Sequence, residues 1–245
     1  MDTSAYLLDT ATAAARAAAA ILSDGTASVL SSVGKDVKLD ADLRAHEVLL
    51  AALKETGIPV LSEEDAEHDF SGERQWVVDP LDGSFNFLRG VPLSAVSVAL
   101  VERGVPVLGV VYDFARNELF AGALGRGATL NGSAISVSIT ARKEDAVIMT
   151  GFPSHGDFSA EGIARTTSFV QSYKKVRLIG SAALSLSWVS CGRADAYIER
   201  GIHLWDVAAG LALVKAAGGD FTMSPPDAQG RCDVSASNGI LTEEV

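Results

Sequence analysis

The nine residues WVVDPLDGS, at positions 76–84, decide the fold class and indicate the chemistry. The apolar run Trp76–Val78 predicts a buried strand, and the following proline fixes the backbone φ angle where the chain turns. The glycine and serine at the end are typical of a helix start, where unpaired N–H groups bind anions. Carboxylates beside such amides fit together only if cations lie between them. The stretch therefore predicts a divalent metal held over a phosphate by Asp79 and Asp82.

Composition limits the class of protein. The chain has 245 residues, of which 48% are hydrophobic and 21% charged, so it can bury a sizeable core in one or two domains. A net charge of -11 disfavours partners such as nucleic acid or an anionic membrane, because both require a broad basic patch. We expect a small phosphorylated substrate, received by a metal. Cys191 and Cys232 form no CxxC pair, which is typical of a reduced cytosolic protein with buried thiols.

The alanine-rich residues 11–22 are not expected to act as a signal sequence. Asp2 and Asp9 make the leading flank acidic, and Arg16 interrupts the apolar run. No stretch reaches the roughly 20 apolar residues that a membrane-spanning helix needs. We predict an amphipathic helix over residues 4–22 and a cytoplasmic protein without membrane association.

In the first half of the chain, on both sides of residues 76–84, the sequence pattern predicts helices and an antiparallel sheet. A leucine stripe predicts a helix from Asp42 to Glu55, which Gly57 ends. Short apolar runs separated by glycines predict strands at residues 59–61, 76–78, 94–101, 105–112 and 118–122. The turn at Arg103-Gly104 favours an antiparallel hairpin over a βαβ crossover. Residues 23–37, rich in small side chains, are expected to be the most flexible segment.

After Ala141 the strand and helix signals alternate, which is typical of an α/β arrangement. Strands are predicted at residues 146–150, 176–179 and 194–199, and helices at residues 160–173, 182–191 and 204–217. The cationic residues Lys174, Lys175 and Arg177 are interpreted as a solvated helix end. We therefore predict an α+β part over residues 1–140 and an α/β part over residues 141–245.

Five acidic residues stand at the ends of predicted elements, where sites gather: Asp42, Glu63, Asp79, Asp82 and Asp206. Some of them also have a plainer interpretation. Asp42 and Asp206 are suitable helix N-caps, and Glu63 could belong with Glu64 to a solvated acidic loop. Position alone leaves these alternatives open.

Two segments resemble the inositol monophosphatase family of magnesium-dependent, lithium-sensitive phosphatases. They are LSEEDAEHDFSGERQWVVDPLDGSFNFLRGVPLSAVSVAL, residues 61–100, and GSAALSLSWVSCGRADAYIERGIHLWDVAAGLALVKAAGG, residues 180–219. The DPxDG motif, with Glu63 before it and Trp205-Asp206 after it, makes the resemblance specific. The resemblance implies a layered αβαβα sandwich, which the family shares with fructose-1,6-bisphosphatases, and a homodimer.

The resemblance also implies a metal ligand set. Glu63, Asp79 and the backbone carbonyl of Leu81 match the ligands of a first magnesium ion. Asp79, Asp82 and Asp206 match those of a second, and a third, largely hydrated ion would depend on Glu63. All-oxygen coordination that retains water is what magnesium prefers.

The mechanism that the resemblance implies is in-line attack on phosphorus by water that a cation activates. Orientation and deprotonation of that water fall to a hydroxyl and a carboxylate, here Ser84 and Asp42. The family usually has threonine at the position of Ser84, and serine lacks the methyl group that restricts χ1. The phosphate would bind the backbone N–H groups of Gly83 and Ser84. Gly83 could equally serve only as a tight turn.

One basic residue of the family pattern is missing. The family has a lysine in the loop before Asp42, and Ser31 stands at that place. Lys35 or Lys38 could substitute for it if the loop is shifted.

The resemblance bears on the substrate as well. Glu199 matches a carboxylate that accepts hydrogen bonds from inositol hydroxyls, and the remaining matching contacts are Asp82, Gly180, Ser181, Ala182 and Asp206. By contrast, the loop at residues 59–65 resembles that of phosphoadenosine phosphate phosphatases. Inositol 1-phosphate is the favoured substrate, with 3′-phosphoadenosine 5′-phosphate and fructose 1,6-bisphosphate as alternatives. A weakly active protein that serves as an interaction partner is the non-enzymatic alternative.

Overall fold

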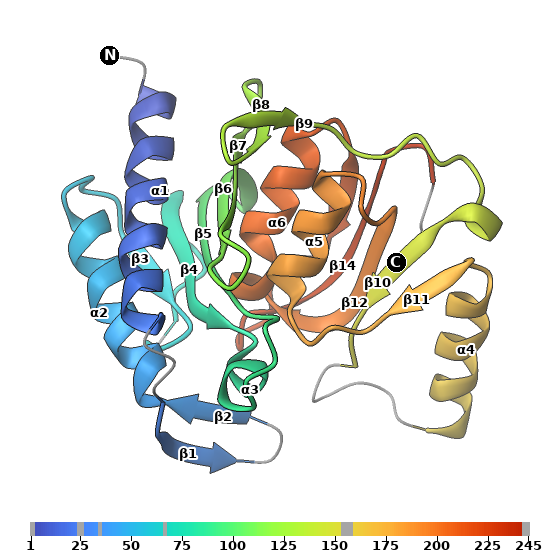
Figure 1. The fold of residues 1–245 in the computed structure, drawn as a ribbon, viewed down its shortest axis with the longest axis horizontal. Helices are drawn as coiled ribbons and strands as arrows, with labels where there is room; N and C mark the ends of the chain where they lie inside the picture. The colour runs from blue at the N-terminus through green and yellow to red at the C-terminus, as the bar shows by residue number, and fades with distance from the viewer. Residues whose placement is uncertain (1–2, 24–26, 34–35, 66–67, 153–158, 242–245) are drawn as a thin grey trace.

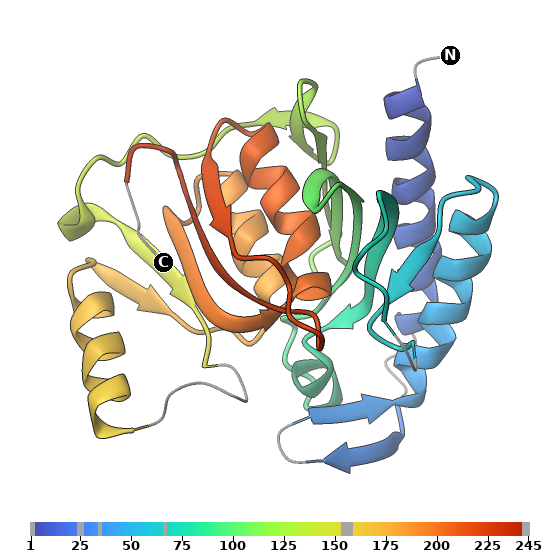
Figure 2. The same cartoon turned by 180° about the vertical axis from the view of Figure 1, so that it is seen from behind.

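The computed structural model describes residues 3–23, 27–33, 36–65, 68–152 and 159–241, and they form five stacked layers (Figure 1). Helices α1 (Thr3–Leu22) and α2 (Asp40–Lys54) cover the outer face of a seven-stranded sheet. Helices α5 (Ala182–Ser190) and α6 (Leu204–Ala216) lie between that sheet and a five-stranded one (Figure 2). Helix α4 (Ala160–Gln171) covers the far side of the second sheet. The predicted αβαβα sandwich is confirmed.

The seven-stranded sheet has the order β3-β4-β5-β6-β7-β8-β9. Its strands are β3 (Val60–Ser62), β4 (Arg74–Asp82), β5 (Ala95–Glu102), β6 (Val105–Asp113), β7 (Glu118–Ala123), β8 (Gly127–Leu130) and β9 (Ser133–Ile135). Only the β3–β4 pair is parallel. Glu102 pairs with Val105 across the turn at Arg103-Gly104, so the predicted hairpin is confirmed.

The apolar runs of this sheet are continuous because both of its faces are buried. In β4, Trp76 and Val78 pack on the side of α1 and α2, while Val77 packs on the side of α5 and α6. Successive side chains of a strand point to opposite faces, so each run supplies two cores at once. The buried β4 therefore carries its terminal carboxylates to the edge of the middle layer.

Helix α6 is apolar on all sides because it lies in that middle layer. Ala208 and Ala209 pack toward the first sheet, and Val207 and Leu211 pack toward the second. Gly109 of β6 permits this close approach, since a Cβ atom there would lie 2.1 Å from the Ala209 carbonyl oxygen. The position of α6, and with it Asp206, depends on that contact.

The five-stranded sheet has the order β11-β10-β12-β14-β13. Its strands are β10 (Val147–Thr150), β11 (Lys175–Arg177), β12 (Ala196–His203), β13 (Asp220–Met223) and β14 (Arg231–Ser237), and a 3-10 turn, Lys143–Asp145, precedes it. Strands β10, β11 and β12 are parallel, as their helical connections require. The sequence pattern missed β13 and β14, which join antiparallel to the β12 edge.

Several predicted boundaries differ from those of the structure. The cationic cluster was predicted to end a helix, but α4 ends at Gln171 and Lys175–Arg177 form edge strand β11. The side chains of Lys175 and Arg177 are exposed to solvent, and charged side chains are common on an edge strand. Helix α2 begins at Asp40, two residues before the predicted start.

The segment predicted to be flexible contains two short strands within its described residues. They are β1 (Val29–Val33) and β2 (Asp36–Leu39), which pair antiparallel and lead directly into α2. The flexibility itself and the division of the chain near Ala141 stay predictions. Cys191 and Cys232 are both free thiols, and Cys191 is only partly buried.

Candidate metal and phosphate site

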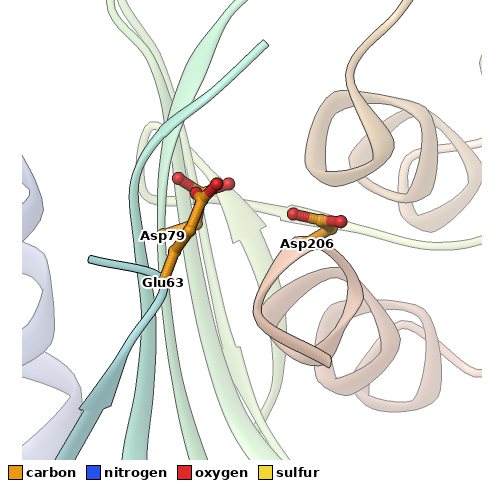
Figure 3. A group of neighbouring side chains, drawn as sticks. All are labelled: Glu63, Asp79 and Asp206. Carbon is orange, nitrogen blue, oxygen red and sulfur yellow. The ribbon is translucent and has the colours of Figure 1, made fainter. Parts of the chain in front are cut away.

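Three carboxylates from different elements converge at the junction of the first sheet and the middle layer (Figure 3). Glu63 follows β3, Asp79 lies in β4, and Asp206 lies in the first turn of α6. One oxygen from each carboxylate lies within 4.8 Å of the other two. Figure 3 shows Asp206 extending from its helix toward the pair on the sheet. This spacing allows one cation to contact all three residues.

Burial and mutual repulsion act against the charged forms of these groups. Desolvation first, and neighbouring carboxylates second, raise the pKa values of Asp79 and Asp206 well above the ordinary aspartate value. Desolvation likewise raises the pKa of Glu63 to about 7. Asp79 is buried and Glu63 and Asp206 are partly buried, and such a cluster of like charges is costly unless cations compensate it. The donor set, all carboxylate oxygens, fits a hard divalent cation.

The chain offers little positive charge of its own here. Of the described residues that line the cavity, Lys38 is the one with a permanent positive charge. Its Nζ atom lies 2.8 Å from Oε2 of Glu64, whose side chain is 2% exposed. The Glu64 side chain is thus buried and paired with a half-exposed lysine, rather than solvated in a loop. Lys35, the other lysine considered from the sequence, lies outside the described residues.

Asp82 lies apart from this three-carboxylate set although it lines the same cavity. Its Oδ2 atom accepts hydrogen bonds from the Ser181 hydroxyl and, at 2.9 Å, from the Ala183 N–H. Burial raises the pKa of Asp82 to about 6, although these donors oppose the shift. Asp82 therefore links β4 to the start of α5.

A bulge in β4 gives Asp79 and Asp82 their common direction. In a regular strand, residues three apart point to opposite faces. The β4–β5 register shifts between Asp79 and Asp82, which pair with Ser97 and Ala95, so β4 has one extra residue there. Oδ1 of Asp79 also accepts the Leu81 N–H at 2.8 Å, which holds the bulge. The motif Asp-Pro-Leu-Asp thereby turns both carboxylates into one cavity.

The residues after the bulge begin the short helix α3 (Ser84–Leu88), as predicted. Gly83 has a φ of 85°, and a Cβ atom there would lie 2.7 Å from the Leu93 carbonyl oxygen, so only glycine fits. The Ser84 hydroxyl donates to the Leu81 carbonyl at 2.9 Å and lies 3.5 Å from Oδ1 of Asp42. The structure thus brings the predicted hydroxyl and carboxylate together.

Asp42 and Asp206 are not helix N-caps, contrary to the plainer interpretation. Each is the third residue of its helix, and each carboxylate accepts the N–H of the residue just before the helix, namely Leu39 or His203. This is one half of a capping box, in which the side chain of the third helical residue reaches back to the N–H of the N-cap residue. Burial raises the pKa of Asp42 to about 7.

The carboxylates of Glu63, Asp79, Asp82 and Asp206 open into one cavity of about 560 Å³, which Gly83 and Ser84 also line. Its opposite wall carries the predicted substrate contacts Gly180, Ser181, Ala182 and Glu199. Glu199 is 9% exposed, and its pKa is raised to about 7, chiefly by burial. The carboxylate cluster and the predicted substrate contacts therefore line the same cavity.

Two features of the cavity were missed from the sequence. The Asn86 side-chain amide donates to the carbonyls of Leu93 and Ile179, both at 2.8 Å, and so fastens α3 to the wall before α5. Phe85 and Phe152 line the cavity and are more than half exposed, at 57% and 56%. Polar contacts over 93 positions in sequence leave no local pattern, so only the fold reveals them.

His203 packs against an aromatic ring rather than joining the carboxylate set. Its ring centroid lies 4.6 Å from that of Trp205 in an edge-on arrangement, and His68 lies 4.8 Å from the same ring.

Comparison with known proteins identifies the class. The sequence matches the model of the inositol monophosphatase family over residues 4–244. A Nus factor SuhB of Xylella fastidiosa is 40% identical over 199 residues, which cover 79% of this chain and 71% of that protein. A fructose-1,6-bisphosphatase/inositol-1-monophosphatase of Thermotoga maritima is 36% identical, covering 86% of this chain and 81% of that protein.

Solved structures of inositol monophosphatases have the same fold as this chain. The inositol monophosphatase of Anabaena (Nostoc) sp. PCC 7120 has a TM-score of 0.83 and 37% identity, covering 96% of this chain and 91% of that one. Fold and site together define a metal-dependent phosphatase that acts on small phosphorylated substrates. The chain belongs to the inositol monophosphatase family. No helix among the described residues is long and apolar enough to cross a membrane.

Proposed function

We propose that the protein hydrolyses inositol 1-phosphate with magnesium as its cofactor. The observation that carries this proposal is Glu199, a buried carboxylate that lines the same cavity as Glu63, Asp79 and Asp206. A carboxylate accepts hydrogen bonds from neutral hydroxyls and repels a second phosphate group. A polyol with a single phosphate therefore suits this wall best.

The carboxylates would hold two to three magnesium ions, with Glu63, Asp79 and Asp206 nearest to one another and Asp82 on the side of α5. The Leu81 carbonyl would be a further ligand. Bound magnesium supplies charge neutralisation, a lowered pKa for water and stabilisation of the leaving oxygen. The Ser84 hydroxyl uses one lone-pair direction of the Leu81 carbonyl, and a second remains for a cation.

Ser84 and Asp42 would orient the attacking water and take up its proton. Support comes from their contact at 3.5 Å and from the pKa of Asp42, which is raised to about 7 and so suits a base near neutral pH. The phosphate would accept hydrogen bonds from the N–H groups of Gly83 and Ser84, because N–H groups at the start of a helix have no carbonyl partner within that helix. Inhibition by lithium and a homodimeric state complete the proposal.

A substrate panel tests the proposal. Phosphate release is measured with magnesium on inositol 1-phosphate, fructose 1,6-bisphosphate and 3′-phosphoadenosine 5′-phosphate. We expect the highest kcat/KM on inositol 1-phosphate, and lithium should inhibit that activity. Activity on the nucleotide alone would refute it. A preference for the bisphosphate would favour the combined activity that the name of the Thermotoga maritima relative states.

A protein-binding role is the second candidate, and the name of the Xylella fastidiosa relative, a Nus factor, favours it. The same carboxylates argue against a purely structural role, since all five predicted acidic residues are present. Magnesium binding in a calorimeter without phosphate release from any of the three substrates would support this second candidate.

A further inference from the structure

The substrate wall contains a buried tyrosine next to Glu199. Tyr197 and Glu199 lie two residues apart on β12, so their side chains share one face of the sheet. The Tyr197 hydroxyl donates to Oε2 of Glu199 at 2.8 Å. Tyr197 is 1% exposed, which leaves its ring no other rotamer without disturbing the core. The buried Tyr197 hydroxyl therefore fixes the position of Oε2 of Glu199.

A glycine holds the other side of the same carboxylate. Strand β10 runs parallel to β12, with Thr150 paired to Ile198, so Gly151 comes beside Glu199. A Cβ atom at Gly151 would lie within 2.7 Å of the carboxylate carbon and both of its oxygens. The Thr150 hydroxyl donates to the Ile198 carbonyl at 2.7 Å and keeps the strands in place. The carboxylate thus fits into a slot between a phenol and a bare backbone.

The slot determines which atom of Glu199 a ligand can reach. Among the described residues, Tyr197 is the one side chain that donates to this carboxylate, and it uses Oε2. Oε1 remains as an acceptor on a residue that lines the cavity. Burial raises the pKa of Tyr197 well above its ordinary value, so the phenol stays a donor at any working pH.

We propose that Tyr197 is a positioning residue for substrate recognition: it holds Glu199 so that Oε1 accepts a hydroxyl of the substrate, in the space that Gly151 leaves. The inference rests on the proposed function, because it needs a hydroxyl-bearing substrate. The neighbouring carboxylate of Asp82 favours a neutral hydroxyl over an anionic group at this position.

A double-mutant cycle tests the positioning role. Tyr197→Phe removes the donor and keeps the ring, and we expect KM for inositol 1-phosphate to rise about five- to tenfold with a smaller change in kcat. In a Glu199→Ala background there is no carboxylate to hold, so Tyr197→Phe should change KM by less than about twofold. The matched control is Tyr112→Phe on β6, which loses a 2.8 Å hydrogen bond from the tyrosine hydroxyl to Asn117 Oδ1.

Gly151→Ala gives an independent second test. The added methyl group would displace the Glu199 carboxylate, so KM should rise at least as much as in Tyr197→Phe, while circular dichroism shows a folded protein. For both variants, the KM ratio to wild type should be larger for inositol 1-phosphate than for p-nitrophenyl phosphate, which has no ring hydroxyl.

The outcomes separate this inference from the proposed function. If wild type prefers fructose 1,6-bisphosphate or the nucleotide, the proposed substrate is wrong, and the same cycle is run on that hydroxyl-bearing substrate. If Tyr197→Phe leaves KM unchanged, or raises it equally with and without Glu199, the positioning role is wrong whichever substrate is used.

Discussion

At the scale of single residues, Asp79 is a buried carboxylate with several neighbours of like charge. The carboxylates of Glu63, Asp82 and Asp206 all raise its pKa, after burial. Its Oδ1 atom also accepts the Leu81 N–H, a bond that an asparagine oxygen can keep. Asp79 thus combines a structural role, which the amide can take over, with a charge that only a cation can stabilise.

We predict opposite effects of Asp79→Asn on activity and on stability. Activity should fall more than about 100-fold, because a shared ligand is lost. The metal-free protein should gain about 1 kcal/mol, or 2–4 °C in Tm, because repulsion is relieved. Phosphate release and thermal unfolding in a chelator measure the two. A lower Tm for the metal-free variant would contradict the picture of unpaired buried charge.

The raised pKa values also predict how stability depends on pH. Burial raises the pKa of Glu63 to about 7 in the folded protein, whereas the ordinary pKa of 4.5 applies when the chain is unfolded. The folded state binds more protons between these values, so stability is full below pH 4.5 and is lost as pH rises through 7. Thermal melts in a chelator should therefore show a falling Tm across this window.

Added magnesium should remove that fall, because it binds the deprotonated carboxylates and stabilises the native state increasingly as pH rises. Melts with saturating magnesium are the control. If the Tm of the metal-free protein instead rose between pH 5 and 7, the carboxylates would not have raised pKa values, and the account would be contradicted.

Ser84 is the residue at which the chain departs from the family's usual threonine. Ser84→Ala should lower kcat about 100-fold or more, because the attacking water loses its hydroxyl partner. Ser84→Thr should keep or raise kcat, because the methyl group restricts χ1. Steady-state kinetics on inositol 1-phosphate measure both. An alanine variant as active as wild type would remove Ser84 from the mechanism.

At the scale of elements, Gly109 sets the distance between β6 and α6. Gly109→Ala would place its methyl group within 2.1 Å of the Ala209 carbonyl oxygen, so the helix must move. We predict a loss of about 3 kcal/mol in the free energy of unfolding, measured by urea titration. Val105→Ala, at a half-exposed position on the same strand, is the control and should cost less than about 1 kcal/mol.

The sequence predicted elements best where apolar runs were long and bounded by glycines. The strands around Arg103-Gly104 follow this rule, since turn and alternation agree. Strands β8, β9 and β13 were missed because short, half-exposed strands have weak patterns. Strand β14 was missed as well, although it is seven residues long and mostly buried. The true start of α2 was missed because Asp42 caps it from the third position, by a longer reach.

At the scale of the whole molecule, the site joins layers that are distant in sequence. Glu63 and Asp79 come from the first sheet, Asp206 from the middle layer, and Glu199 from the second sheet. Motif spacing and family resemblance could nominate these residues, because each stands at the start or the end of an element that the sequence predicts. Their grouping was less predictable: Asp82 lies with Ser181 rather than in the tightest cluster.

The contacts that hold the layers in register could not be predicted from the sequence. Asn86 reaches carbonyls of Leu93 and Ile179, and Gly151 makes room for Glu199, through backbone approaches that leave no periodic pattern. Local rules describe turns and faces, while these contacts arise only when the layers are packed.

The central claim is that buried carboxylates hold magnesium to hydrolyse a phosphate ester. The most direct measurement is phosphate release from inositol 1-phosphate across a magnesium titration, comparing wild type with Asp82→Asn. We predict saturable dependence on magnesium for wild type and a loss of more than about 100-fold for the variant. Equal turnover of the two proteins, or wild-type turnover in a chelator, would contradict the account.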